Sequence, residues 1–172
     1  MKPRNKVFLI FTFSFLTCFF TPAMAFSQTA AELDVLLGTE TVSVAAAARF
    51  ALGAVGLLPP GLSGSAAQNA AYDAAQSRGW VKSGPDDAIS LEGVAFLVMN
   101  AFGIKGGIMY SLAHSPRYAY REMVYRKLIQ GRAYSNMTVS GKRLLQIIGL
   151  ALNYTGEREQ MDGMIMNGEA QR

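Results

Sequence analysis

The residues best suited to bind a ligand are concentrated between Arg117 and Arg143. This segment holds seven basic residues and four tyrosines against a single acid, Glu122. Guanidinium groups offer paired donors to a carboxylate or phosphate, and a tyrosine ring offers an apolar face. The segment predicts a surface for an acidic protein or a charged glycan, and its candidate members are Arg117, Tyr118, Arg121, Tyr125, Arg126 and Arg132.

The same segment also has a purely structural interpretation. Apolar residues recur at helical spacing within residues 116–128, which is typical of the buried face of an amphipathic helix. On this interpretation the basic residues are only the solvated face. The residues assigned to the buried face are Tyr120, Met123, Val124 and Leu128.

Catalytic and metal chemistry has few candidate residues. The chain contains one histidine, His114, and one cysteine, Cys18, so the usual zinc, haem and iron–sulfur ligand sets cannot be assembled. The acids are scattered, and the adjacent Asp86 and Asp87 fit a turn better than a calcium loop. The methionines of residues 161–166 lack a second kind of ligand for copper. We therefore expect no enzyme activity, no metal and no cofactor.

The first 25 residues resemble a secretory signal. Three basic residues are followed by an apolar run over residues 7–20 and by TPAMA, whose small-x-small ending at Ala25 suits signal peptidase. An uncleaved anchor and a lipidated Cys18 are alternatives, although the apolar run is short for a membrane span of about 20 residues. We predict cleavage after Ala25 and export to the periplasm or the cell surface, with no membrane span afterwards.

Charge and cysteine content limit the partners and the fold of the mature chain. Of 16 basic residues three lie in the leader, and the remaining 13 nearly balance 12 acids, for a net charge of +1. A nucleic-acid-binding domain normally carries a strong basic field, so we expect no nucleic-acid partner. Because the one cysteine lies in the leader, an apolar core must stabilise residues 26–154 without disulfides.

The elements that would position the basic residues recur along the chain. A shift of 48 aligns Tyr72, Arg78, Val81, Ile89, Ser90, Gly93 and Leu97 with Tyr120, Arg126, Ile129, Met137, Thr138, Gly141 and Leu145. A shift of 47 aligns Val42, Ser43, Phe50, Ala54, Gly56 and Leu57 with Ile89, Ser90, Leu97, Ala101, Gly103 and Ile104. We therefore divide the chain into three units, at about residues 26–62, 63–108 and 109–154.

Each unit has a polar first helix, a loop, and an apolar second helix that follows a Ser or Thr. We predict first helices at residues 28–36, 66–78 and 116–128, and second helices at 44–57, 91–104 and 139–153. Ser43, Ser90 and Thr138 are the predicted N-caps, because their oxygens can accept from first-turn amides. The second helices are too short to span a membrane and are predicted core helices. Residues 155–172 are polar and predict a flexible tail.

This pattern resembles the S-layer homology repeat. The stretch YAYREMVYRKLIQGRAYSNMTVSGKRLLQIIGLAL is similar to that family's first helix, loop and second helix, and WVKSGPDDAISLEGVAFLVMNAFGI is similar as well. The resemblance covers nearly all of the mature chain. It implies an all-α fold in which three helix-loop-helix repeats pack as one pseudo-threefold domain, and a role in attaching secreted proteins to cell-wall glycans.

The chain departs from the family in its charged recognition motif. The family's repeat reads Thr-Arg-Ala-Glu after the apolar residue, with the arginine important for glycan binding. The arginine positions here hold Val44, Leu91 and Val139, and the glutamate positions hold Ala46, Gly93 and Gly141. The resemblance therefore bears on the fold more directly than on glycan binding.

We expect an exported, non-enzymatic structural or binding module of the bacterial envelope that contacts another envelope protein. One alternative is a carbohydrate-binding domain, similar to the S-layer homology family, that attaches to peptidoglycan or a cell-wall polymer. Another is a minor component of an extracytoplasmic appendage or filament sheath. Trp80 is predicted to pack in the core, because its repeat equivalents, Leu33 and Leu128, are apolar.

Overall fold

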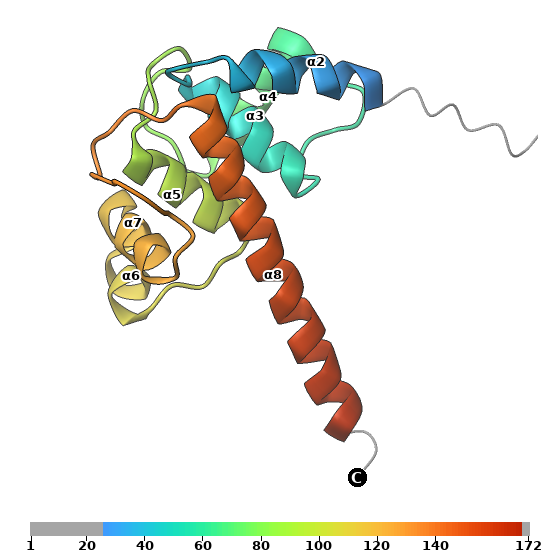
Figure 1. Ribbon diagram of the computed structural model, residues 1–172, viewed down its shortest axis with the longest axis vertical. Helices are drawn as coiled ribbons and strands as arrows, with labels where there is room; N and C mark the ends of the chain where they lie inside the picture. Colours follow the sequence, from blue (N-terminus) through green and yellow to red (C-terminus); the bar gives the residue numbers. More distant parts are fainter. Residues whose placement is uncertain (1–25, 170–172) are drawn as a thin grey trace, which may run out of the picture.

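Helices account for all regular structure in the described part of the chain (Figure 1). The computed structural model describes the backbone of residues 26–169 and the side chains of residues 30–163. The predicted all-α fold is confirmed, whereas the predicted leader and Cys18 lie outside the described residues. The helices are α2 (Phe26–Leu37), α3 (Val44–Ala54), α4 (Gly64–Ser77), α5 (Leu91–Ala101), α6 (Ile108–Ala113), α7 (Pro116–Tyr125) and α8 (Gly141–Glu169).

Serine caps start α3 and α5 at the predicted residues. The Oγ of Ser43 accepts from the Ala46 amide at 3.3 Å, and the Oγ of Ser90 accepts from the Gly93 amide at 3.2 Å. Both serines have extended backbone, as an N-cap requires. Each cap therefore satisfies an amide that the first turn of a helix leaves without a partner.

The start of α8 differs from the prediction. Thr138 is not its N-cap, because the helix begins three residues later, at Gly141. Thr138 instead forms an antiparallel bridge with Ser90, and the carbonyl of the preceding Met137 accepts from the Leu91 amide at 2.8 Å. Backbone pairing with the second unit thus replaces the local cap, and the predicted cap at Thr138 is wrong.

The loops that precede α3, α5 and α8 are hydrogen-bonded to one another. The Val42 amide donates to the Val139 carbonyl at 2.9 Å, and the Ile89 amide donates to the Val42 carbonyl at 3.0 Å. Three segments far apart in the sequence therefore meet at one junction. Beyond this junction α3, α5 and α8 contact one another, and their facing side chains form the core.

The remaining long helices pack around these three (Figure 1). α4 packs on α3, α7 packs on α5, and α2 packs on α8. The second helix of one predicted unit is thus paired with the first helix of the next unit, and α2 of the first unit is paired with α8 of the last. Between residues 30 and 163 all the fully buried side chains are apolar. A pseudo-threefold relation among the units stays a prediction.

Gly141 permits the close approach of α8 to α2. A Cβ atom at this position would lie 1.7 Å from the backbone oxygen of Leu36, so no other residue fits without a backbone shift. The Gly141 amide also donates to the Thr39 carbonyl at 2.9 Å. This contact joins the first described helix to the last one.

Several helix bounds differ from the prediction. No helix was predicted at α6, the second helices α3 and α5 end three residues early, at Ala54 and Ala101, and α7 ends at Tyr125 rather than at residue 128. α8 continues without a break through residues predicted as a separate tail, as far as Glu169, and projects from the body (Figure 1). Despite its length, α8 is too polar to cross a bilayer, and no other helix of residues 26–169 qualifies either.

Residues related by the shift of 48 have matching roles. The hydroxyl of Tyr72 donates to the Ser83 carbonyl, and that of Tyr120 donates to the Ala133 carbonyl, each at 3.0 Å. Gly79 and its equivalent Lys127 both follow a first helix with positive φ, +71° and +61°. The left-handed conformation costs glycine little but strains a residue with a Cβ atom. Lys127 in the third unit is therefore in a less favourable conformation than Gly79 in the second.

Candidate contact surface

α6 presents large apolar side chains to solvent. Its buried residue, Tyr110, packs edge-on against Phe96 with ring centroids 6.4 Å apart, and burial raises the pKa of the Tyr110 hydroxyl. On the opposite side Ile108 and Leu112, one turn apart, are 85% and 83% exposed, and Met109 beside them is 63% exposed. A six-residue helix thus has one anchoring residue and an apolar outer side.

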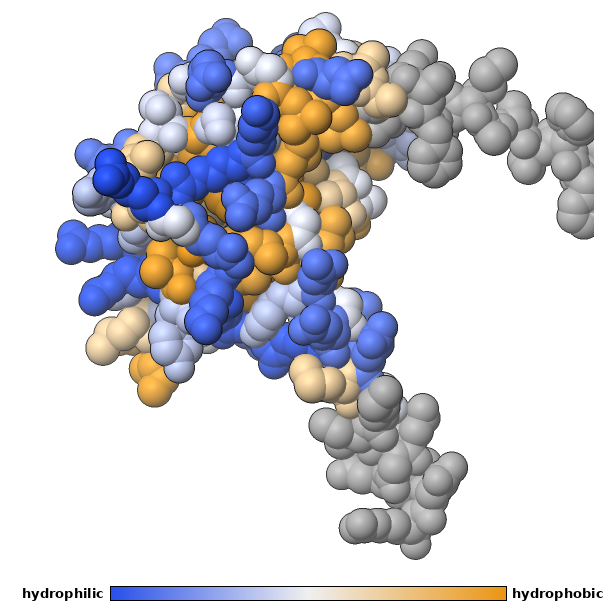
Figure 2. All heavy atoms as spheres, in the orientation of Figure 1, coloured by the Kyte–Doolittle hydropathy of each residue, from blue (hydrophilic) through white to orange (hydrophobic). Residues whose placement is uncertain are grey.

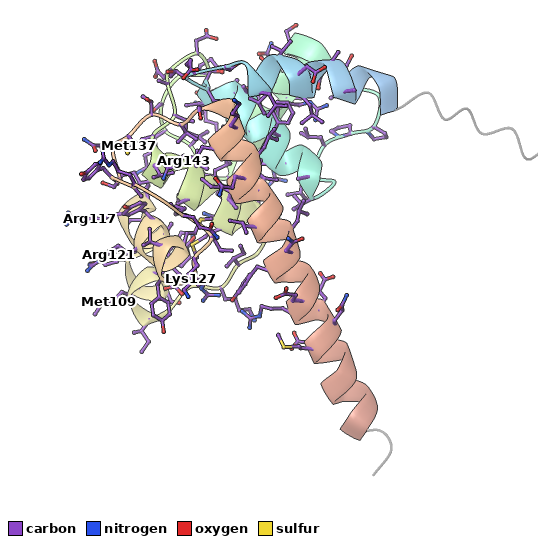
Figure 3. All side chains as sticks on the ribbon, in the orientation of Figure 1. Met109, Arg117, Arg121, Lys127, Met137 and Arg143 are labelled. Atoms are coloured by element: carbon purple, nitrogen blue, oxygen red, sulfur yellow. The ribbon has the colours of Figure 1, made fainter. Side chains whose placement is uncertain are left out.

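α7 presents cations from a helix that is anchored in the core. Its buried residues are Ala119 and Met123. Arg121 lies on the opposite face, where Arg117 is one turn earlier and Tyr125 one turn later, and all three are exposed. Figure 3 shows Arg117 and Arg121 along the same edge of the molecule as Met109 of α6, whereas Lys127 lies further in, on the side of α7 toward α8.

Arg126 joins α7 to the segment before α6 and to α8. Its guanidinium donates to the Lys105 carbonyl at 2.7 Å and pairs with Glu122 at 2.7 Å. It also donates to the hydroxyl of Tyr154, above whose ring it lies. These contacts hold the end of α7 beside the start of α6 and use the donors of Arg126 internally.

We call the resulting surface the α6–α7 face. Apolar atoms lie at the lower left tip of the body, and hydrophilic side chains cover the neighbouring region over α7 (Figure 2). The acid within this segment, Glu122, is paired with Arg126, so the other cations have no carboxylate beside them in α6 or α7. The face consists of Ile108, Met109, Leu112, Arg117, Arg121 and Tyr125.

The candidate residues from the sequence separate into three groups. Arg117, Arg121 and Tyr125 lie on the α6–α7 face, and Arg132 is exposed in the following loop, where its carbonyl accepts from Arg143 at 2.9 Å. Tyr118 is half-buried against the core. Arg126 makes internal contacts.

Both interpretations of the segment are partly realised. Met123 and Leu128 are buried as the structural interpretation expects, whereas Val124 is exposed. The sequence reasoning missed Ile108, Met109 and Leu112. The signal for these residues was the isolated apolar cluster in GGIMYSLAH, where a lone aromatic could anchor a short helix.

Two grooves lie at equivalent places in the first two units. The first, of about 440 Å³, lies between α2, α3 and the start of α4, and the second, of about 270 Å³, lies between the end of α4, α5 and the start of α7. Ser43 and Gln68 line the first groove where their repeat equivalents, Ser90 and Pro116, line the second. Trp80 lines the second groove and, as predicted, packs against the core while remaining half-buried.

The first groove contains an ion pair with one unused donor. Arg49 and Glu32 lie 3.2 Å apart, and Glu32 also accepts from the Gly64 amide at the start of α4 at 2.8 Å. The Nε of Arg49 is buried and has no hydrogen-bond partner among the described residues. The Arg49 side chain lines the groove and is partly exposed, while its Nε is closed off from solvent.

Residues 26–169 contain no group of three or more His, Cys, Asp or Glu side chains placed to hold a metal ion. His114 contacts Asn100 through Nε2 at 3.1 Å and stacks against Tyr110. Asp87 accepts from the Gly84 amide at 2.7 Å, as the predicted turn requires.

Comparison of the chain with protein-family models, curated proteins and solved structures gives no match.

Proposed function

We propose that this chain is an exported, non-enzymatic binding module of the bacterial envelope that attaches to another envelope component through the α6–α7 face. A signal-like N-terminus and scattered acids support the compartment and the lack of catalysis. The helical core supplies a rigid support, and α6 and α7 supply the contact residues.

One observation carries this proposal: nearly fully exposed Ile108 and Leu112 lie on α6, whose Met109 shares an edge of the molecule with Arg117 and Arg121, and these cations have no neighbouring carboxylate in α6 or α7. Single exposed apolar residues are ordinary on protein surfaces, but a cluster of them marks an interaction site. The cations add long-range attraction to an anionic partner.

Site-specific cross-linking in the producing cells tests the proposal. A photo-crosslinking residue at Leu112 should capture an envelope component, whereas the same residue at Met161, 55% exposed on α8, should capture little. Fractionation provides a second measurement, because Ile108→Ser with Leu112→Ser should release the protein from the envelope fraction. Equal capture at both positions, or unchanged retention, would refute a contact through this face.

A second candidate function is carbohydrate binding by a degenerate S-layer homology domain. The observation that favours it is the pair of grooves at corresponding places, one of which is lined by the partly exposed Arg49. Arginine donors on an apolar wall suit a sugar that bears a carboxylate. This function would use the grooves and leave the α6–α7 face free.

Sedimentation with purified sacculi tests the second candidate. Arg49→Met removes the donors but leaves Glu32 without its partner, so Arg49→Met with Glu32→Gln is the matched variant that removes both charges. Both should abolish saturable sedimentation if the groove binds glycan, while Arg121→Gln on the α6–α7 face should not. Sedimentation that is lost with Arg121→Gln alone would contradict the groove.

A further inference from the structure

We infer that the partner of the α6–α7 face is the surface of a bilayer that contains anionic phospholipid. This inference rests on the proposed function and names the partner of the same face. The chain would lie against the membrane with α6 inserted among the headgroups, and no part of α6 or α7 would cross the bilayer.

The first argument is the shape and chemistry of α6. Ile108 and Leu112 project from the outer side of a short helix whose other side is anchored by Tyr110. The hollow beside α6 is lined by Asn100, Tyr110 and His114, on the anchored side, and not by the projecting residues. Apolar side chains on a protruding tip match a fluid interface, which needs no complementary pocket, better than a rigid partner.

The second argument is the composition of the rim. Arg117 and Arg121 lie along the same edge as Met109 of α6 (Figure 3). Long cationic side chains around an apolar tip can reach phosphates while the tip enters the acyl boundary. Tyr125, 84% exposed, is the residue type that prefers the headgroup level of a membrane.

The third argument concerns Glu122 and Arg126. Their ion pair removes the one carboxylate of α7 from the surface, and the Arg126 donors are used by Lys105 and Tyr154. The remaining cations of α7, Arg117 and Arg121, are exposed and make no side-chain hydrogen bond or ion pair among residues 30–163. Such cations attract a continuous layer of phosphates, whereas recognition of a defined acidic protein would favour fixed, paired donors.

Vesicle sedimentation of the processed protein tests the inference. Binding to vesicles of phosphatidylglycerol and phosphatidylcholine should be strong, and binding to phosphatidylcholine alone should be weak. Arg121→Gln should lower the partition coefficient about fivefold, and Ile108→Ser with Leu112→Ser should lower it by about tenfold or more. Val35→Ser and Lys82→Gln, exposed on other elements, are the matched controls and should leave it unchanged.

A depth probe separates insertion from simple charge attraction. Cysteine introduced at Leu112 in a Cys18→Ser background, labelled with an environment-sensitive fluorophore, should shift its emission to the blue on anionic vesicles. The same label at Val35 should not shift. Binding that is equal for all variants, or the same shift at both positions, would overturn the inference.

The outcome also distinguishes this inference from the proposed function. If no variant binds vesicles but the cross-linker at Leu112 captures a protein or a glycan, the lipid partner is wrong and the contact face stands. If neither vesicles nor an envelope component is bound through Leu112, both proposals fail.

Discussion

The helix pairs α3/α4 and α5/α7 have equivalent places in the fold but are built from different side chains. The buried residues of α3 and α4 are mostly alanine, while α5 buries Leu91, Phe96, Leu97 and Met99, and α7 adds Met123. Small side chains let helix axes approach closely, and large ones hold them further apart. The two pairs therefore share the way in which their helices are connected, but they differ in the size of the side chains that pack between the helices.

The two pairs also differ in what they present to solvent. The α3/α4 pair adjoins a groove whose Arg49 is paired with Glu32. Beside the α5/α7 pair lies the additional helix α6, whose tip is apolar and whose neighbouring cations are exposed. The first pair thus adjoins a groove whose cation is paired with an acid, and the second pair adjoins exposed cations and an apolar tip.

The largest difference between the pairs should appear when a large core residue is truncated. Leu97→Ala removes a fully buried side chain from α5 and should lower the free energy of unfolding by about 3 kcal/mol, because it leaves a cavity. Urea denaturation followed by circular dichroism measures the loss. Leu152→Ala, at a partly exposed position of α8, is the control and should cost much less. Equal losses would show that α5 is not the packing centre.

The α3/α4 pair, whose buried residues are mostly alanine, should be destabilised when a small buried side chain is enlarged. Ala71→Leu enlarges a fully buried side chain of α4 where α3 is close, and should lower the free energy of unfolding by about 2 kcal/mol. Asn69→Leu, exposed on the same helix, should change it little. If thermal or urea unfolding shows that Ala71→Leu is tolerated, the pair is looser than the alanines indicate.

The caps should contribute about equally to the two pairs. Ser43→Ala and Ser90→Ala should each lower the free energy of unfolding by about 1 kcal/mol, because a first-turn amide loses its acceptor. Thr138→Ala is the matched control, since Thr138 caps no helix, and should cost less in the same urea titration. A loss at Thr138 as large as at the serines would contradict the bridge that replaces the cap.

The smallest effect is expected where the two units differ in backbone strain. Lys127→Gly gives the third unit the residue that the second has at Gly79, and should raise the free energy of unfolding by about 0.5 kcal/mol, because released strain exceeds the added chain entropy. Urea denaturation followed by circular dichroism measures the gain. A loss of stability would show that the lysine is not strained at this position.

The sequence predicted those features of the fold that depend only on neighbouring residues. The caps at Ser43 and Ser90 follow from a Ser before an apolar helix, and both were predicted correctly. Thr138 has the same local pattern, but pairing with Ser90 from another unit overrides it. The start of α8 depends on a contact between distant residues, so helical spacing could not reveal it.

The candidate surface was predicted in its charges and missed in its apolar part. The high number of basic residues in the sequence identified α7 as a candidate, because the charge of a residue follows from its type alone. That count could not show that Arg126 would be used by Lys105 and Tyr154, which lie on other segments. Nor could it show that Ile108 and Leu112 face outward, because this depends on which single residue of α6, Tyr110, reaches the core.

The closeness of Leu36 and Gly141 determines when this chain can finish folding. Most of the described residues lie between them, so the contact belongs to the slow, non-local class whose formation requires closing a long loop. A chain that crosses a membrane with its N-terminus first would carry α2 without its packing partner until residue 141 emerged. Under the export that we propose, α2 and α8 could therefore pack together only after residue 141 had crossed.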